Sequence, residues 1–185
     1  VPQAQVDQDA AALTAYMETI KAPTTDFDRG TMSADALAGL ELFQGAAGCV
    51  ACHGGPNFTD GLEHNTLVPQ PAPMFPGAPL NNDPGRQPPP SGSRCGDVNF
   101  PVDPLKPLVC AFNTPTLRGV GLAGTEPFMH NGFCGQSSAM PGGDPAKCDT
   151  LAEVVRFYDL ESSVKDEITL TTTEASQLVK FLESL

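Results

Sequence analysis

The segment Cys49-Val50-Ala51-Cys52-His53 constrains this chain more than any other part of its sequence. It reads C-x-x-C-H, which is the attachment signature of a c-type haem. Two thiols three positions apart can each bond to one vinyl group of a porphyrin, and the histidine that follows then lies under the iron as its proximal ligand. The motif therefore predicts a backbone that folds around a covalently fixed, largely apolar group.

Other sites also use a C-x-x-C pair. A zinc site needs a second cysteine pair or an H-x-x-x-H pair, and the sequence has neither. A thioredoxin-like dithiol follows a buried strand in a βαβ unit, and no such pattern surrounds these residues. A disulfide between Cys49 and Cys52 would leave His53 unexplained. Because the motif occurs once, we predict one covalent haem c.

Apolar spacing and capping motifs predict a mostly α fold. The four expected helices are residues 7–21, a helix that begins after Ser33 and ends near Gly45, one that begins at the capping box Thr150–Glu153, and one that begins at the capping box Thr171–Glu174. Twelve of the 19 prolines lie between Pro69 and Pro107, which predicts a long loop at about 68–110. We expect a cytochrome c-like helical domain around the haem, with long Pro/Gly-rich loops.

The net charge and the cysteine content limit which partners and which cellular compartment fit this protein. The net charge of −12 argues against nucleic-acid binding and fits a basic redox partner protein, although it also serves solubility. No apolar run is long enough to span a membrane. The start of the chain lacks a signal-peptide pattern, so we expect a mature chain or a fragment.

Four cysteines lie outside the haem motif, and an even number fits an oxidising compartment. Three pairings are open. We favour Cys95–Cys110 and Cys134–Cys148, because each bond would close a loop that has few other restraints. Disulfides and haem attachment together indicate the periplasm or the exterior of a bacterium.

Five segments resemble, in order, the C-terminal haem domain of the bacterial di-haem cytochrome c peroxidase / MauG family. They are Leu40–Phe43 with Gly48–Pro56, Phe58–Gly61 with His64-Asn65, Phe112–Gly119, Pro127–Gly132, and Leu151–Tyr158. The resemblance implies that residues 1–30 are a helix and connection like the end of a preceding haem domain, and that 31–185 form the haem domain. The sequence departs from the family in having one haem motif and no tryptophan.

The resemblance also implies a ligand on the distal side of the iron. Tyr158 matches a position that supplies methionine in the family's peroxidases and tyrosine in MauG-like proteins. A core aromatic at an apolar helix position is the alternative. Met129 and Met140 are further candidates for the distal ligand, although methionines more often fill gaps in a core.

Further roles follow from the same resemblance. Arg118 matches a residue that neutralises a haem propionate, and His64 is expected to hydrogen-bond near the haem edge. His130 is expected near the haem as a proton relay or propionate partner, with iron ligation as a further option. His130 and Glu126 are the only nearby acid–base candidates for peroxide chemistry.

Two residues match positions whose carbonyls bind a calcium ion between the family's haem domains. These are Thr125 and Pro127, and an ordinary turn is the alternative. In the family, the first haem domain supplies another ligand of this ion.

Two functions compete, and we favour the first, because peroxide reacts at the other haem in the family that the chain resembles. The first is a periplasmic c-type haem protein that transfers electrons through a six-coordinate iron. The second is a haem peroxidase or MauG-like oxidase, alone or with a second haem domain or subunit. A binding module stabilised by haem is a third reading, motivated only by the proline-rich loop.

Overall fold

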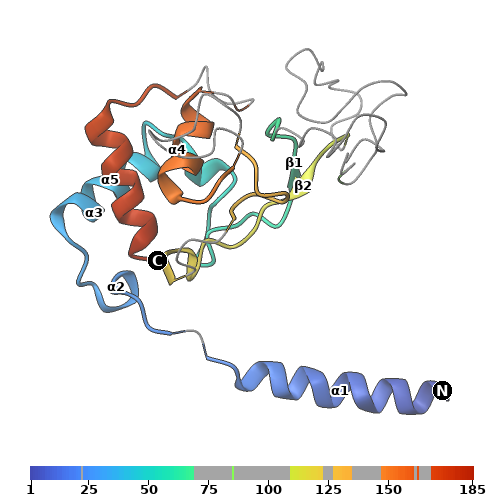
Figure 1. The fold of residues 1–185 in the computed structure, drawn as a ribbon. Coiled ribbons are helices and arrows are strands. Elements are labelled where there is room, and N and C mark those ends of the chain that lie inside the picture. Colours follow the sequence, from blue (N-terminus) through green and yellow to red (C-terminus); the bar gives the residue numbers. More distant parts are fainter. Residues whose placement is uncertain are drawn as a thin grey trace.

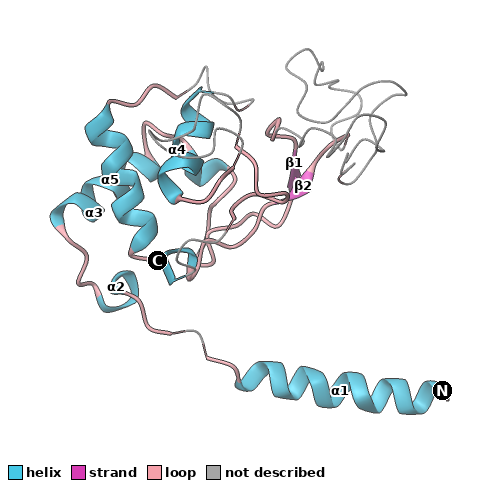
Figure 2. Cartoon of the chain, viewed as in Figure 1, coloured by secondary structure: helices cyan, strands magenta, loops and turns pink. Residues whose placement is uncertain are grey.

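The computed structural model describes residues 1–21, 23–68, 85, 109–122, 127–134, 147–160, 162 and 168–185 of the 185-residue chain. Within these residues the fold is mostly α, as predicted (Figures 1 and 2). The elements are α1 (Gln3–Thr19), α2 (Asp26–Arg29), α3 (Ala34–Gln44), the 3-10 turn η1 (Cys49–Ala51), β1 (Glu63–His64), β2 (Phe112–Asn113), the 3-10 turn η2 (Val120–Leu122), α4 (Leu151–Leu160) and α5 (Thr172–Glu183).

Three of the helices begin where their capping residues predict. The Ser33 hydroxyl accepts a hydrogen bond from the backbone of Ala36 at 3.1 Å and starts α3. The predicted boxes Thr150–Glu153 and Thr171–Glu174 cap α4 and α5 through reciprocal bonds, which satisfy amides that a helix start leaves without partners. These predictions are confirmed.

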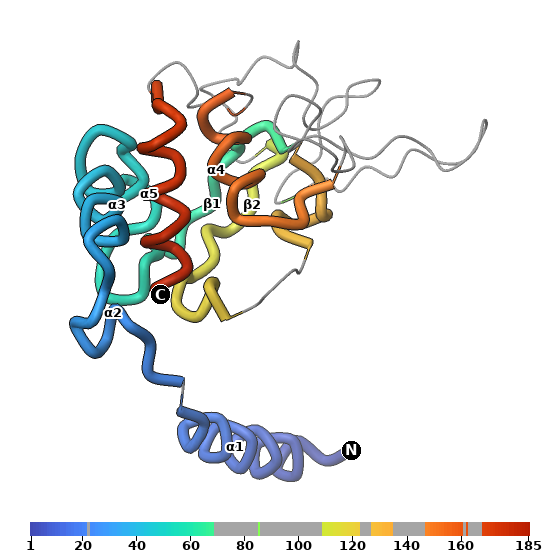
Figure 3. The backbone as a smooth tube through the Cα atoms, turned by 60° about the vertical axis from the view of Figure 1, so that its left-hand side comes forward, coloured from blue at the N-terminus to red at the C-terminus, as the bar shows by residue number. Residues whose placement is uncertain are grey.

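The main core lies where α3 crosses α5, and the two helices are adjacent in Figures 1 and 3. Gly39 permits this crossing, because a Cβ atom there would lie 2.0 Å from the backbone oxygen of Gln177. The buried side chains of this core are Phe43, Ala47, Phe58, Val155, Leu178, Phe181, Leu182 and Leu185.

A second apolar cluster lies on another face of α4. It consists of Val68, Cys134, Cys148 and Phe157, with Phe128, Met129, Val154 and Tyr158 partly buried around it. Helix α4 therefore joins the main core to the segment 127–134, and its Tyr158 faces this second cluster.

A short ladder holds the chain after the haem motif. Strands β1 and β2 pair antiparallel, with Glu63 opposite Asn113 and His64 opposite Phe112. The Thr59 hydroxyl donates to the carbonyl of Thr114 at 2.6 Å, which extends this contact toward the motif. Two-residue strands carry no alternating pattern, so the sequence did not predict them.

Helix α1 differs most from the rest. It begins and ends earlier than the predicted 7–21, none of its residues is buried, and it extends away from the other helices (Figures 1 and 3). Leu13, Tyr16, Met17 and Ile20, whose i, i+3, i+4 and i+7 spacing predicts the helix 7–21, are 58% to 64% exposed. Among the described residues, no helix is long and apolar enough to cross a membrane.

Candidate haem site

The two motif cysteines lie on one turn of backbone. Gly48 takes a left-handed conformation (φ 63°) and starts η1, and the amide of His53 then donates to the carbonyl of Cys49 at 2.9 Å. Both thiols are free and half-buried. Burial raises the pKa of Cys49 to about 11 and also raises that of Cys52, so both are protonated at neutral pH. Protonated thiols do not suit a redox dithiol, which needs a thiolate.

His53 is neutral, and one of its ring nitrogens lies within hydrogen-bond distance of a backbone carbonyl. Its Nδ1 atom lies 3.1 Å from the carbonyl oxygen of Phe58, and the carbonyl of Pro115 also acts on the ring. Burial nevertheless lowers the pKa of His53, because it penalises the charged form. When Nδ1–H donates to Phe58, the lone pair of Nε2 is free to bind a metal.

Phe58 supports this arrangement at a conformational cost. Its backbone is left-handed (φ 52°), which costs a non-glycine residue about 1–2 kcal/mol. Its ring is 7% exposed and packs edge-to-face against Phe27, Phe43 and Phe181 at centroid distances of 5.2, 5.9 and 5.9 Å. We infer that this aromatic packing holds the unfavourable backbone in place.

Asp60 and His64 lie beside Cys52. The imidazole Nε2 of His64 is 2.7 Å from a carboxylate oxygen of Asp60, and the amide of Asp60 donates to the carbonyl of Cys52 at 2.8 Å. One donor atom from each of the three residues lies within 4.8 Å of the others. Such a set suits a divalent cation such as zinc only while Cys52 is a free thiol. A thioether at Cys52 would therefore compete with cation binding.

A carboxylate can complete a zinc site that has no second cysteine or histidine pair. Asp60 was not among the predicted site residues, although its i, i+4 spacing from His64 was the available signal. The expectation that His64 bonds near a haem edge stays a prediction.

Asp60 makes stability depend on pH. The backbone N–H of Leu62, then His64, lowers the pKa of Asp60 from 3.8 to about 2. A lowered folded-state pKa stabilises the fold above the unfolded value, and this contribution is lost as the pH falls from about 4 to about 2. Asp60→Asn is therefore expected to flatten the loss of stability across this range, measured by urea unfolding. An Asp7→Asn control on the exposed α1 should keep the wild-type slope, and equal slopes in all three proteins would contradict the prediction.

Tyr158 lies near the motif. Burial, followed by the charges of Cys52 and Cys49, raises the pKa of Tyr158 to about 12, while a hydrogen bond with the Thr66 side chain acts in the opposite sense. Its phenol is thus protonated unless a metal displaces the proton. Met129, the alternative ligand, is partly buried around the same cluster and has a left-handed backbone (φ 62°). The other alternative, Met140, is outside the described residues.

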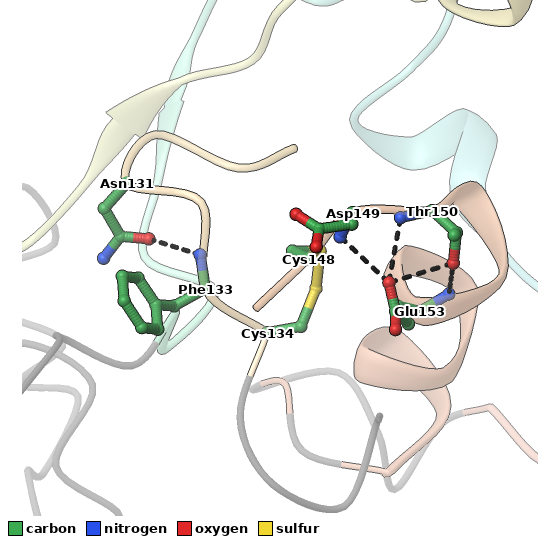
Figure 4. The surroundings of a disulfide bond; sticks show 7 residues. All are labelled: Asn131, Phe133, Cys134, Cys148, Asp149, Thr150 and Glu153. Atoms are coloured by element: carbon green, nitrogen blue, oxygen red, sulfur yellow. Dashed lines mark hydrogen bonds between the residues drawn. A yellow bond between two sulfur atoms is a disulfide. The ribbon is translucent and has the colours of Figure 1, made fainter. Parts of the chain in front are cut away.

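A disulfide ties this region to α4 (Figure 4). Cys134 and Cys148 form the predicted bond, and both are fully buried. A closed loop of this length contributes roughly 3 kcal/mol in the chain-entropy model. The amide of Phe128 donates to the carbonyl of Cys148 at 2.7 Å, and the amide of Cys148 donates to Gly132 at 2.8 Å. The segment that carries Met129 is therefore fixed against the start of the helix that carries Tyr158.

The other predicted residues are spread around this centre. His130 stacks on Phe112, with ring centroids 3.6 Å apart and planes 13° from parallel. Pro127 is exposed, whereas Thr125 and Glu126 lie outside the described residues, so the calcium site stays a prediction. Cys110 is disulfide-bonded, and its predicted partner Cys95 also lies outside them.

Arg118 lies between the N-terminal connection and the haem motif. Its guanidinium forms an ion pair with Asp28, and its Nε atom donates to the carbonyl of Pro56 at 2.9 Å. The same group lies 5.1 Å from the ring centroid of Phe27 and 5.4 Å from that of Phe58. The sequence predicted a propionate partner here and did not predict these contacts, and the propionate role stays a prediction.

The donor set fits a covalent c-type haem. Two free, protonated thiols and a neutral imidazole lie within five consecutive residues, and Nδ1 of the imidazole already has an acceptor. Tyr158 lies close enough to both cysteines for a charge on either sulfur to raise its pKa. Thioether attachment requires two free cysteines, and axial ligation requires a neutral imidazole, so these residues meet both requirements.

Comparisons with known proteins agree with this chemistry. No protein-family model matches the chain. Cytochrome-c peroxidase IdrP2 of Pseudomonas sp. strain SCT is 35% identical over 187 residues, which cover 91% of this chain and 45% of that protein. Methylamine utilization protein MauG of Methylorubrum extorquens strain AM1 is 30% identical over 184 residues, covering 95% of this chain and 43% of that protein. The chain thus spans about half the length of these relatives.

One solved structure resembles the fold. Hydrazine synthase of Kuenenia stuttgartiensis superposes with a TM-score of 0.53 at 22% sequence identity, covering 94% of this chain and 54% of that chain. At this identity the likeness concerns the fold alone. The described helices and their connections therefore form an arrangement that also occurs in a solved protein.

Proposed function

Since this chain is related to the di-haem cytochrome c peroxidase / MauG family, we propose that it is a c-type haem domain that transfers electrons. Cys49 and Cys52 would hold the haem through thioether bonds, with His53 as the proximal ligand. When bound, the haem supplies one-electron chemistry by changing between ferric and ferrous iron. The observation that carries the proposal is the pair of free thiols followed by a neutral histidine whose Nδ1 faces the Phe58 carbonyl.

The protein's own residues would perform three tasks. The hydrogen bond from Nδ1 to Phe58 orients the imidazole and raises its basicity toward the metal. The main core, to which Phe58 belongs, would exclude water from the proximal side. Tyr158 would bind on the distal side as a phenolate, a hard anionic donor that favours ferric iron, and it would release its proton on binding.

Replacing Tyr158 with phenylalanine tests the distal assignment. We expect ferric iron to change from low spin to high spin, because phenylalanine has no oxygen to complete six-coordination. Electron paramagnetic resonance and visible absorption of the ferric protein measure this change. Tyr16→Phe is the matched control, because Tyr16 is the other tyrosine of the chain and lies exposed on α1.

Other outcomes reassign the ligand. An unchanged low-spin spectrum in Tyr158→Phe would make Tyr158 a core aromatic. A methionine-to-iron charge-transfer band that disappears in Met129→Leu or Met140→Leu would give the role to that methionine.

The net charge indicates the kind of redox partner, and the covalent haem and the disulfide indicate the cellular compartment. The net charge of −12 would steer a basic redox protein toward this chain, at a rate that falls as salt rises. Haem attachment and the buried disulfide fit the periplasm or the exterior of a bacterium. We further propose that residues 1–30 connect to a preceding domain or subunit and that 31–185 form the haem domain.

A peroxidase or MauG-like oxidase is the second candidate, because the relatives carry those names. Peroxide chemistry needs an open or displaceable distal position and a nearby acid–base group. His130 and Glu126 are the candidates for that group. Of the two, the described residues include His130, which stacks on Phe112.

Peroxide separates the two functions. The ferric protein is expected to keep its spectrum when hydrogen peroxide is added, because a tightly held distal ligand blocks the iron. A high-spin signal that converts to a ferryl spectrum would overturn the pure carrier and favour the peroxidase. Absence of covalent haem after expression with a c-type maturation system would overturn both.

A further inference from the structure

The connection that follows α1 contacts the residue that supports His53. The ring of Phe27 in α2 lies edge-on against Phe58 at 5.2 Å and against Phe181 at 6.3 Å. The amide of Phe27 donates to the carbonyl of Ser184 at 3.0 Å. Both the ring and the backbone of Phe27 are thus fixed to the main core.

A second link runs through Asp28. Its carboxylate accepts bonds from the amide and the hydroxyl of Thr25 at 3.1 and 2.9 Å and pairs with Arg118. Arg118 in turn donates to the carbonyl of Pro56 and lies over the ring of Phe58. The capping box of α2, the guanidinium and the segment after the haem motif are therefore connected by direct contacts.

Phe58 contacts both the α2 region and His53. Its ring meets Phe27 and Arg118, while its carbonyl faces Nδ1 of His53 at 3.1 Å. Ring and carbonyl belong to one residue with a left-handed backbone (φ 52°), and we infer that ring contacts that hold this residue in place also hold its carbonyl. A stronger Nδ1–H bond makes an imidazole a better donor, and a better donor favours ferric iron.

We propose that Phe27 and Asp28 of α2 set the ferric–ferrous balance of the haem by holding the Phe58 carbonyl on Nδ1 of His53. Phe27 and Asp28 are positioning residues in this scheme, which rests on the proposed ligation by His53. The Pro115 carbonyl also acts on the His53 ring, and the next residue is anchored outside α2 by a bond from the Thr116 hydroxyl to the carbonyl of Asn57 at 2.5 Å. Loss of the α2 contacts is therefore expected to weaken the support of His53 and not to abolish it.

Two substitutions in the haem-loaded full chain test the proposal. Phe27→Leu removes the ring contact and keeps an apolar side chain, while Asp28→Asn removes the charge that holds Arg118. Each is expected to shift the ferric–ferrous equilibrium toward ferrous iron by about fivefold, the worth of a typical net hydrogen bond. Redox titration followed by visible absorption measures the shift, and faster hydrogen exchange at Nδ1 of His53, measured by NMR, should accompany it. Arg118 itself is left intact, because it is also the predicted propionate partner.

Two controls separate positioning from charge and from stability. Asp26→Asn removes the same charge from the same helix, but Asp26 pairs with Arg29 and Thr31 and has no contact with Arg118 among its described bonds. Ile168→Ala removes a buried side chain that belongs to none of the described clusters. We expect Ile168→Ala to lower the free energy of unfolding without a change in potential.

The outcomes are distinguishable. If Phe27→Leu and Asp28→Asn titrate like the two controls, the positioning role is overturned although the haem is bound. If no variant carries haem, and neither does the wild type, the proposed function itself fails. A shift in potential with unchanged exchange at Nδ1 would also overturn the proposal, because it would place the effect elsewhere.

Discussion

A chain in which Cys49 and Cys52 are both replaced with serine is expected to lose all covalently bound haem. Serine hydroxyls do not form thioethers with the vinyl groups, so only axial ligation by His53 would remain. The haem of the variant should be extracted by acidified organic solvent, and the mass of the denatured chain should fall by one haem. Denaturing gels stained for haem give a second measurement.

The matched control keeps the motif and removes another cysteine pair. Cys134→Ser with Cys148→Ser loses two sulfur atoms and the buried disulfide, but it should retain haem on Cys49 and Cys52. Wild-type chain that emerges from a c-type maturation system without haem would contradict the prediction. Zinc found in that chain would point to the cluster of Cys52, Asp60 and His64.

Gly39→Ala should destabilise the fold by about 2 kcal/mol, although alanine favours helices by about 1 kcal/mol over glycine. The added Cβ would lie 2.0 Å from the backbone oxygen and 2.6 Å from the backbone carbon of Gln177, so α3 and α5 would have to separate. Urea unfolding followed by circular dichroism measures the loss. The sign of the change is informative because it opposes the intrinsic propensity.

A neighbouring position on α3 provides the control for this crossing. Leu37 is 49% exposed, and Leu37→Ala is expected to change stability by no more than about 0.5 kcal/mol. A Gly39→Ala protein as stable as the wild type would mean that α3 and α5 do not approach this closely.

Local motifs predicted the described helices better than they predicted tertiary contacts. Ser33, Thr150 and Thr171 set the starts of α3, α4 and α5, because a cap bonds to amides only a few residues away. The four-residue α2 was missed, since one turn has no apolar period, although Thr25 and Asp28 form its capping box. The predicted apolar face of α1 is real in the sequence, yet it meets no buried surface among the described residues.

In the candidate site, too, local motifs predicted some residues and the tertiary contacts were not predicted. The motif gave the cysteines and His53, because their roles depend on spacing within five residues. The carbonyl of Phe58 and the placement of Arg118 on Asp28 depend on how distant segments pack, and no local pattern encodes them. Asp28 and Arg118 are 90 positions apart, so their pairing appears only once α2 lies against the chain that follows the motif.

The bond between Cys134 and Cys148 also has a topological consequence. With the intervening backbone it closes a covalent ring that spans 14 positions. A single peptide cleavage anywhere in that ring therefore opens the ring without dividing the molecule. The fragment with His53 and the fragment with α4 would stay joined through sulfur until a reductant is added. A nicked protein would thus migrate as one species on a non-reducing gel and as two on a reducing gel.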